Sequence, residues 1–235
     1  MSHRTIAVGD IHGCATALDS LLRSIDPKPD DTLITLGDYI DRGPNSRAVI
    51  DKLILLAGQC RLIRLVGNHE EMLMQAWSDK AAIKKWLEVG GVDTLRSYGW
   101  VRGGAPRPLR EWFPRPHQEF IEGCQSYWET PTHIFVHAGV LPDLALNQQP
   151  AAALRWRVAS AENALPHCSQ KTVVVGHTPQ FSGDILDLGH LVCIDTNCVR
   201  RGWLTAVNVE SGQIWQANQA GETRKNRLRS ATVRV

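Results

Sequence analysis

Short apolar runs recur along the chain, and polar or turn-forming residues separate them. Continuous apolar runs of this length are typical of buried β-strands. We predict strands at residues 5–8, 32–36, 62–66, 133–136, 172–175 and 191–194. Between the first three, apolar residues recur at helical spacing over 15–22 and 46–56. This alternation of strand and helix predicts an α/β protein with helices on its sheet faces.

The stretch from about 70 to 130 has a different pattern. It contains no clear strand, a loop rich in Pro and Gly at 103–108, and five tryptophans: Trp77, Trp86, Trp100, Trp112 and Trp128. We predict a helical insertion at about 71–130 within a single catalytic domain spanning 1–218. Such an insertion can select substrates, or its tryptophans can simply fill the core, and the sequence favours neither.

Composition and charge narrow the class of protein. The chain is 43% hydrophobic and 21% charged, which is ordinary for a globular domain. Its net charge of +2 and the lack of a basic stripe argue against nucleic-acid binding. Basic residues cluster only near the end, so we expect residues 219–235 to form a flexible basic tail. No apolar stretch approaches the ~20 residues of a membrane span, so we expect no membrane partner.

Six cysteines occur without paired or regular spacing, and the first residues lack the apolar segment of a signal peptide. This combination favours reduced thiols and a cytoplasmic protein.

Residues that can bind a metal follow five of the predicted strands. They are Asp10 and His12, Asp38, Asn68, His137, and His177. Any one of them alone would be most simply a cap or turn residue. Because the carboxyl ends of parallel strands line the ligand crevice of an α/β sheet, five such positions together indicate a metal site.

These side chains are enough for two divalent ions. Asp10, His12 and Asp38 could hold the first, and Asn68, His137 and His177 could hold the second, with Asp38 bridging. Oxygen and nitrogen ligands without thiolate suit Mn²⁺, our expected ion, with Fe and Zn²⁺ as alternatives. Because an asparagine ligand is neutral, it does not cancel the charge of the metal ions. The cluster therefore keeps excess positive charge, which favours an anionic substrate such as phosphate.

Three further residues near the ligands have catalytic chemistry. Arg42 could bind phosphate oxygens through its two-pronged guanidinium. His69, paired with Asp41, could act as a general acid for the leaving oxygen. The alternatives are a local ion pair between Asp41 and Arg42, and a purely structural His69.

The ordered motifs "GDIHG", "GDYIDRG", "GNHEEM", "HAGV" and "VVVGHTP" resemble those of the phosphoprotein phosphatases, within the calcineurin-like metallophosphoesterases. The segment "WLEVGGVDTLRSYG" is similar to the small bacterial and phage lambda-type enzymes. The resemblance implies a four-layer sandwich of two mixed β-sheets flanked by helices. It also implies the ligand and acid roles given above, and a second phosphate-binding arginine in "LRWRVAS", where Arg157 matches better than Arg155.

On this resemblance we expect a protein serine/threonine phosphatase that also accepts phosphotyrosine and attacks phosphorus with a hydroxide bridging two metal ions. Its partners would be phosphorylated proteins or small phosphoesters, and it would be a monomer or weak oligomer. The alternative is a symmetrical diadenosine tetraphosphate hydrolase. Those enzymes usually have alanine at the position of Asp41, which favours the phosphatase. A non-catalytic metal-binding scaffold is a remote third possibility, because no predicted ligand is missing.

Overall fold

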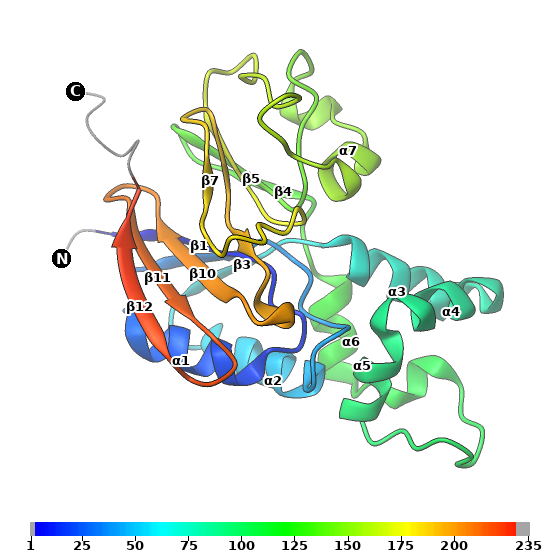
Figure 1. The fold of residues 1–235 in the computed structure, drawn as a ribbon. Coiled ribbons are helices and arrows are strands. Elements are labelled where there is room, and N and C mark those ends of the chain that lie inside the picture. Colours follow the sequence, from blue (N-terminus) through cyan, green and yellow to red (C-terminus); the bar gives the residue numbers. More distant parts are fainter. Residues whose placement is uncertain (1–2, 229–235) are drawn as a thin grey trace.

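Residues 3–228 are described by a computed structural model of the chain, and they fold into two mixed β-sheets. In the first sheet the strand order is β12-β11-β10-β1-β2-β3, with β9 paired to β10, and in the second it is β4-β5-β6-β8-β7 (Figure 1). The first sheet comprises β1 (Thr5–Val8), β2 (Thr32–Thr35), β3 (Arg61–Arg64), β9 (Asp195–Thr196), β10 (Trp203–Asn208), β11 (Gln213–Ala217) and β12 (Thr223–Arg227). The second comprises β4 (Tyr127–Glu129), β5 (His133–Val136), β6 (Thr172–Val175), β7 (Leu186–Asp187) and β8 (Leu191–Cys193).

Each sheet contains a run of three parallel strands, which ends at the edge strand β3 in the first sheet and lies in the middle of the second. In the first sheet β1, β2 and β3 are parallel, and in the second β5, β6 and β8 are parallel. All six strands predicted from apolar runs belong to these two sets. The loops that leave their carboxyl ends carry the predicted metal ligands, so the arrangement of strands determines where the site forms.

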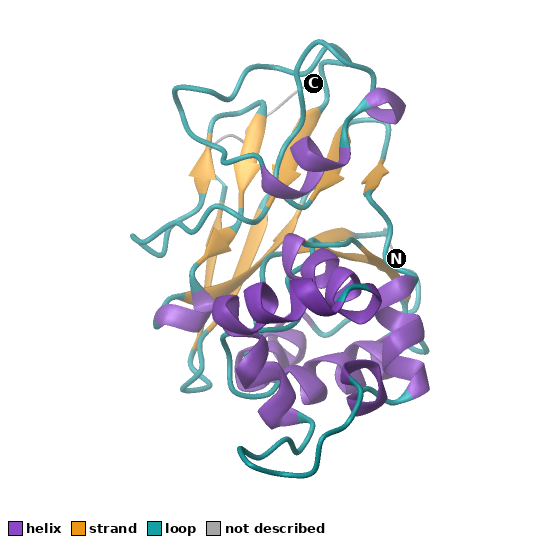
Figure 2. Ribbon diagram, turned by 90° about the vertical axis from the view of Figure 1, so that its right-hand side faces the viewer, coloured by secondary structure: helices purple, strands orange, loops and turns teal. Residues whose placement is uncertain are grey.

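Helices cover the outer faces of both sheets, as Figure 2 shows. Helices α1 (Ala15–Ile25), α2 (Ser46–Leu56) and α6 (Arg115–Glu122) lie on the side of the first sheet, and α7 (Ala151–Trp156) lies on the side of the second. None of the helices within residues 3–228 has the length and apolarity that crossing a bilayer requires.

The buried apolar side chains of the described residues form three clusters, one between each pair of layers. Along β1, Ile6 and Val8 face the helices while Ala7 faces the second sheet. Phe135 of β5 meets Ala7 in this central cluster, and its neighbour Ile134 packs toward Leu154 of α7. Helix, sheet, sheet and helix therefore form four layers, and the predicted fold class is confirmed.

The segment predicted as a helical insertion contains mostly helices. After α3 (Asn68–Ser78) come α4 (Lys80–Trp86), a segment kinked at Gly90 (Leu87–Gly91), α5 (Val92–Ser97), a short 3₁₀ turn (Leu109–Trp112) and α6. The expectation that no strand occurs before residue 130 is wrong, because β4 pairs with β5. A run of three residues at a sheet edge has too little apolar pattern to be recognised from the sequence.

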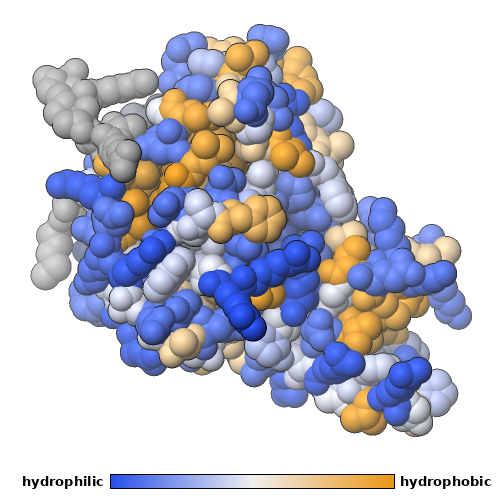
Figure 3. Space-filling view, viewed as in Figure 1, coloured by the Kyte–Doolittle hydropathy of each residue, from blue (hydrophilic) through white to orange (hydrophobic). Residues whose placement is uncertain are grey.

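The expectation of a flexible basic tail is also wrong for residues 223–227. They form β12, which pairs antiparallel with β11 and places Lys225 opposite Trp215. Charged residues are common on edge strands because they oppose pairing with another chain. The same charged residues led to the prediction of a tail from the sequence. Figure 3 shows mostly hydrophilic surface over this part of the molecule. The remainder of the predicted tail, residues 229–235, lies outside the described residues.

Candidate metal centre

The six predicted ligands meet where the two sheets come together, and Asp38 lies at the centre of them. Its Oδ2 is 3.3 Å from Nε2 of His12, and its Oδ1 is 3.5 Å from Nε2 of His137. Asn68 Oδ1 lies 3.0 Å from His137 Nε2 and 3.1 Å from His177 Nδ1. Residues from both sheets are therefore arranged around one carboxylate.

Asp10 connects the two sheets directly. Its carboxylate accepts hydrogen bonds from the backbone N–H of His177, at 3.1 and 3.0 Å. Gly176 allows this close approach, since a Cβ there would lie only 2.0 Å from the Asp10 carboxylate. The glycine before His177 is thus required by the packing of the site.

The hydrogen bonds of the histidines fix which ring nitrogen faces the centre. Nδ1–H of His12 donates to the Ile40 carbonyl, and Nδ1–H of His137 donates to the Leu36 carbonyl, both at 2.9 Å. The lone pair on His137 Nε2 is then left facing the oxygens of Asp38 and Asn68. The lone pair on His12 Nε2 faces Asp38 Oδ2 and also the Arg42 guanidinium. Acceptors facing acceptors repel one another unless a cation lies between them, and a backbone-oriented histidine is the usual metal-ligand arrangement. The residues therefore fit divalent cations.

Burial keeps these imidazoles neutral, the form that binds metals. It lowers the pKa of His12 to about 3 and that of His177 to about 4. Burial opposes ionisation of Asp38, but the histidines His137 and His69 nevertheless hold its pKa well below the usual range. Neutral imidazoles around a charged carboxylate form a good ligand set at neutral pH.

The backbone is strained at the site. Positive φ angles occur at five non-glycine residues: His12 (44°), Asp38 (50°), Asp41 (71°), Arg42 (66°) and His177 (61°). Such conformations are costly for L-residues and gather where the surrounding structure holds functional side chains in place.

Glu70 supports the site and was not predicted from the sequence. Its buried carboxylate accepts hydrogen bonds from the backbone N–H groups of Asp38 (2.9 Å), Tyr39 (2.8 Å) and Gly67 (3.0 Å). Burial and the neighbouring Asp38 charge raise its pKa to about 8. The signal for it was its position three residues after the N-cap Gly67 of α3, where a Glu side chain accepts from the N-cap N–H as in one half of a capping box.

His69 and Asp41 form the predicted pair. Nδ1–H of His69 donates to Asp41 Oδ2 at 2.7 Å, while His69 Nε2 lies 3.9 Å from Asp38 Oδ2 and faces the centre. Burial opposes protonation of His69, but Asp38 and Asp41 outweigh it and raise its pKa. The arrangement is suited to holding a proton on Nε2.

The inserted helices hold Asp41 in position. Trp86 Nε1–H donates to Asp41 Oδ2 at 3.0 Å, and the Thr94 hydroxyl donates to Asp41 Oδ1 at 2.7 Å. Trp86 is fully buried. This tryptophan of the insertion therefore packs in the core and orients Asp41.

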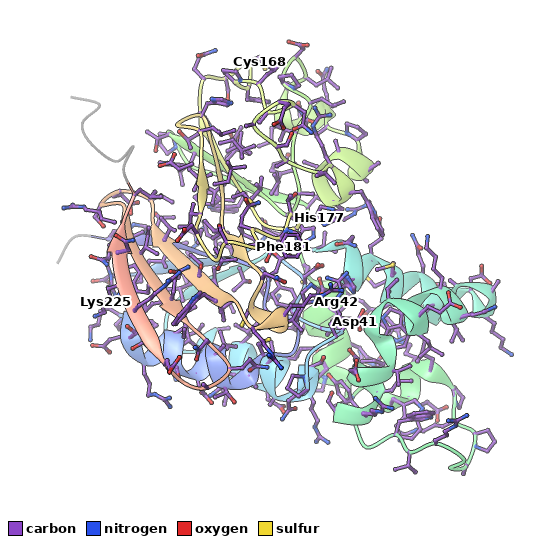
Figure 4. All side chains as sticks on the ribbon, viewed as in Figure 1. Asp41, Arg42, Cys168, His177, Phe181 and Lys225 are labelled. Atoms are coloured by element: carbon purple, nitrogen blue, oxygen red, sulfur yellow. The ribbon has the colours of Figure 1, made fainter. Side chains whose placement is uncertain are left out.

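Arg42 lies at the mouth of the centre with an exposed side chain. Its Nη1 is 2.9 Å from His12 Nε2, and among residues 3–228 no carboxylate forms an ion pair with it. A local ion pair between Asp41 and Arg42 is therefore not present. Figure 4 shows Arg42 near His177 on the same face of the molecule.

The structure places Arg157 away from the ligands. Its side chain packs along Gly139, and its Nη2 lies 3.5 Å from the Asn163 carbonyl. Arg155 forms an ion pair with Glu71 of α3 at 2.7 Å, and its guanidinium adds to the effect of burial in lowering the pKa of His137. Phosphate binding by Arg157 therefore stays a prediction, with Arg155 as the other candidate.

A family model described as "Calcineurin-like phosphoesterase" matches residues 3–200. The chain belongs to this family. Its histidine and aspartate clusters fit the two divalent metals that the family binds.

Three curated relatives of this phosphoesterase share the name "Bis(5'-nucleosyl)-tetraphosphatase, symmetrical". The protein from Acidovorax ebreus (strain TPSY) is 46% identical over 148 residues, covering 62% of this chain and 47% of the relative. The one from Janthinobacterium sp. (strain Marseille) is 30% identical over 148 residues, covering 63% and 47%. That from Pseudomonas putida (strain GB-1) is 24% identical, covering 93% and 94%. In the first two cases the match spans about half the length of the relative.

Solved structures share the fold of this phosphoesterase at low identity. One, provisionally named a diadenosine tetraphosphatase, has a TM-score of 0.61 at 21% identity, covering 95% of this chain and 93% of that one. A cold-active protein tyrosine phosphatase reaches 0.67 at 15%, covering 94% and 78%. A serine/threonine phosphatase from Saccharomyces cerevisiae reaches 0.60 at 16%, covering 96% and 80%.

The expectation of a protein serine/threonine phosphatase is wrong, because the curated relatives bear the name of the alternative. That expectation came from the resemblance of the motifs, and its preference over the alternative depended on Asp41. The structure explains why Asp41 is a poor guide to substrate: its side chain is fully buried and contacts His69, Trp86 and Thr94. A carboxylate enclosed in this way orients a histidine and does not contact the part of a substrate that differs between enzymes.

Proposed function

We propose that the protein hydrolyses dinucleoside tetraphosphates symmetrically, releasing two nucleoside diphosphates. The observation that carries this proposal is the shared name of its curated relatives, one of them 46% identical over 148 residues. The chemistry of the site supports it, since neutral imidazoles, buried carboxylates and an exposed arginine suit cleavage of a bond between phosphates.

In this proposal Asp10, His12 and Asp38 hold one divalent ion, and Asp38, Asn68, His137 and His177 hold another, with Mn²⁺ as the expected ion. Bound there, the two ions would activate water and neutralise charge on the phosphoryl group. Arg42 binds phosphate oxygens and stabilises the charge that develops on them. A second arginine for the phosphate chain would be Arg157 or Arg155, of which Arg155 is ion-paired with Glu71.

His69 donates a proton to the departing phosphate oxygen in this scheme. Asp41 holds the Nδ1 side of the ring, so the proton available for transfer is the one on Nε2. A departing nucleoside diphosphate is a weaker base than an alkoxide. The proton from His69 is therefore less important for this substrate than for an alkyl ester.

The test is a substrate panel with purified protein and Mn²⁺, Mg²⁺ or Zn²⁺ in turn. We expect diadenosine tetraphosphate to be converted to ADP, measured by anion-exchange chromatography, with kcat/KM at least 10-fold above that for a phosphoserine peptide. Chelation with EDTA should abolish the reaction, and added metal should restore it. Dephosphorylation of the peptide without any ADP from the dinucleotide would contradict the proposal.

A further inference from the structure

A cavity of about 180 Å³ adjoins the candidate metal centre and shares His12 and Arg42 with it. Its other walls come from the loop after β6, which contributes Phe181, and from the segment after β9, which contributes Asn197 and Arg200. Sites for drug-sized ligands measure about 300–1,000 Å³, so this one suits a single part of a larger substrate.

Phe181 is the most exposed large apolar side chain among the described residues, with 78% of its surface accessible. The loop that carries it is anchored on both sides: Gln180 N–H donates to the Asp195 carbonyl at 2.8 Å, and the Gly183 carbonyl accepts from Arg224 at 2.8 Å. Figure 4 places Phe181 beside His177 and above Arg42. A fixed loop thus presents a bare aromatic ring next to the centre.

Arg200 lies on the opposite loop of the cavity and is exposed. Asn197, in a left-handed conformation with φ of 61°, begins the 3₁₀ turn Cys198–Arg200. The turn is closed by Arg200 N–H donating to the Asn197 carbonyl at 3.1 Å, and Asn197 N–H in turn donates to the buried Asp195 at 3.0 Å. Within residues 3–228 no carboxylate forms an ion pair with Arg200, so its charge is available to an anion.

We propose that this cavity binds one nucleoside end of the substrate, with the base stacked on Phe181 and Arg200 on the phosphate chain that leads to the centre. The inference rests on the proposed function and adds the residues that select the substrate. Stacking on an aromatic ring accepts any base, because every base has a π face. A free arginine beside it matches the anionic chain that joins base and cleaved bond. Figure 3 shows apolar surface near the middle of this face, bordered by strongly hydrophilic side chains.

The decisive variants change the ring while keeping apolar bulk. Phe181→Leu should raise KM for diadenosine tetraphosphate and the inhibition constant of ADP about 5- to 100-fold, with a much smaller change in kcat. The inhibition constant of inorganic phosphate, which has no base, should change less than about 2-fold. Phe181→Trp, which keeps an aromatic face, should stay near the wild-type values. Leu55→Ala, another exposed apolar residue on α2, is the control for surface substitution.

A matched pair of arginines tests the second loop. Arg200→Met should raise KM for the dinucleotide about 10-fold, because a charge-assisted contact to phosphate is lost. Arg201→Met removes the same charge from the next residue, which is exposed but does not line the cavity, and should change KM less than about 2-fold. Equal effects of the two variants would show that general charge matters and would overturn the role of Arg200.

Failure of this inference can be separated from failure of the proposed function. If the wild-type protein releases ADP but Phe181→Leu and Phe181→Trp behave alike, stacking on Phe181 is excluded and the function stands. If ADP and inorganic phosphate lose affinity together in Phe181→Leu, the variant has disturbed the centre and base recognition is again excluded. If the wild-type protein releases no ADP, the proposed function fails, and this inference fails with it.

Discussion

The two sheets contribute very differently to the centre where they meet. On the first-sheet side, Asp38, Asp41 and His69 are at most 2% exposed, and His69 donates hydrogen bonds to both carboxylates. On the second-sheet side, His177 is half-buried, Trp156 is 39% exposed and Phe181 is 78% exposed. The groups for bond cleavage are buried on both sides, since His137 of the second sheet is fully buried too. The difference teaches that the second sheet in addition leaves side chains open to the substrate.

The largest effect is expected at the residue that both halves share. Asp38→Asn removes a charged ligand from the middle of the cluster, and we expect kcat/KM to fall more than about 10³-fold, since loss of even an outer metal partner costs 10–100-fold. Metal content measured by mass spectrometry should fall below that of the wild-type protein. Full activity in a metal-depleted variant would exclude a metal-dependent centre at Asp38.

A smaller and substrate-dependent effect is expected at His69. His69→Asn should reduce kcat for phenyl phosphate about 10²–10⁴-fold. It should reduce kcat for p-nitrophenyl phosphate much less, because p-nitrophenolate is a weaker base and departs without a proton. The two esters share a ring and a charge, so each is the control for the other. Equal losses on both would remove His69 from the acid role.

A matched pair of tryptophans compares the two sides directly. Trp86 donates to Asp41 at 3.0 Å from a buried position, and Trp156 donates to Glu71 at 2.6 Å from an exposed one. Trp86→Phe should lower the free energy of unfolding by about 2–4 kcal/mol, because it removes a buried donor and leaves a cavity. Trp156→Phe should cost less than about 1 kcal/mol. Urea unfolding measures both, and equal costs would refute the contrast in rigidity.

The smallest expected effect is on the pH dependence of stability, and it involves an ion pair at the far end of the first sheet. Arg4 and the buried Asp31 form an ion pair there. Burial opposes ionisation of Asp31, but Arg4 outweighs it and lowers the pKa of this carboxyl. Because the pKa of Asp31 is lower in the folded protein than the ~3.9 of the unfolded chain, the ion pair stabilises the fold at pH values above about 3.9. This stabilisation is lost as the pH falls through the lower pKa of the folded protein.

Asp31→Asn should therefore lower the free energy of unfolding by about 1–3 kcal/mol at pH 7. The difference in this free energy between variant and wild type should shrink as the pH falls below about 4. Thermal unfolding at several pH values would measure it. A difference that stays constant down to pH 2 would mean that the carboxylate is not the cause.

Much of the centre was predictable because its ligands directly follow apolar strands. A strand of four residues such as β1 is recognisable from its own sequence, and the parallel arrangement brings its end to the others. The supporting residues were not predictable. Thr94 and Trp86 contact Asp41 across 53 and 45 positions of sequence, and no local pattern records such contacts. The same holds for β12, whose charges gave it the appearance of a tail until its pairing with β11 was seen.

The most direct test of the account follows diadenosine tetraphosphate in ¹⁸O-labelled water with Mn²⁺ present. The account predicts ADP as the sole nucleotide product, with one labelled oxygen per molecule of substrate cleaved, found by mass spectrometry on a terminal phosphate of ADP. Release of ATP and AMP, or failure to cleave the dinucleotide while protein phosphoesters are hydrolysed, would contradict it.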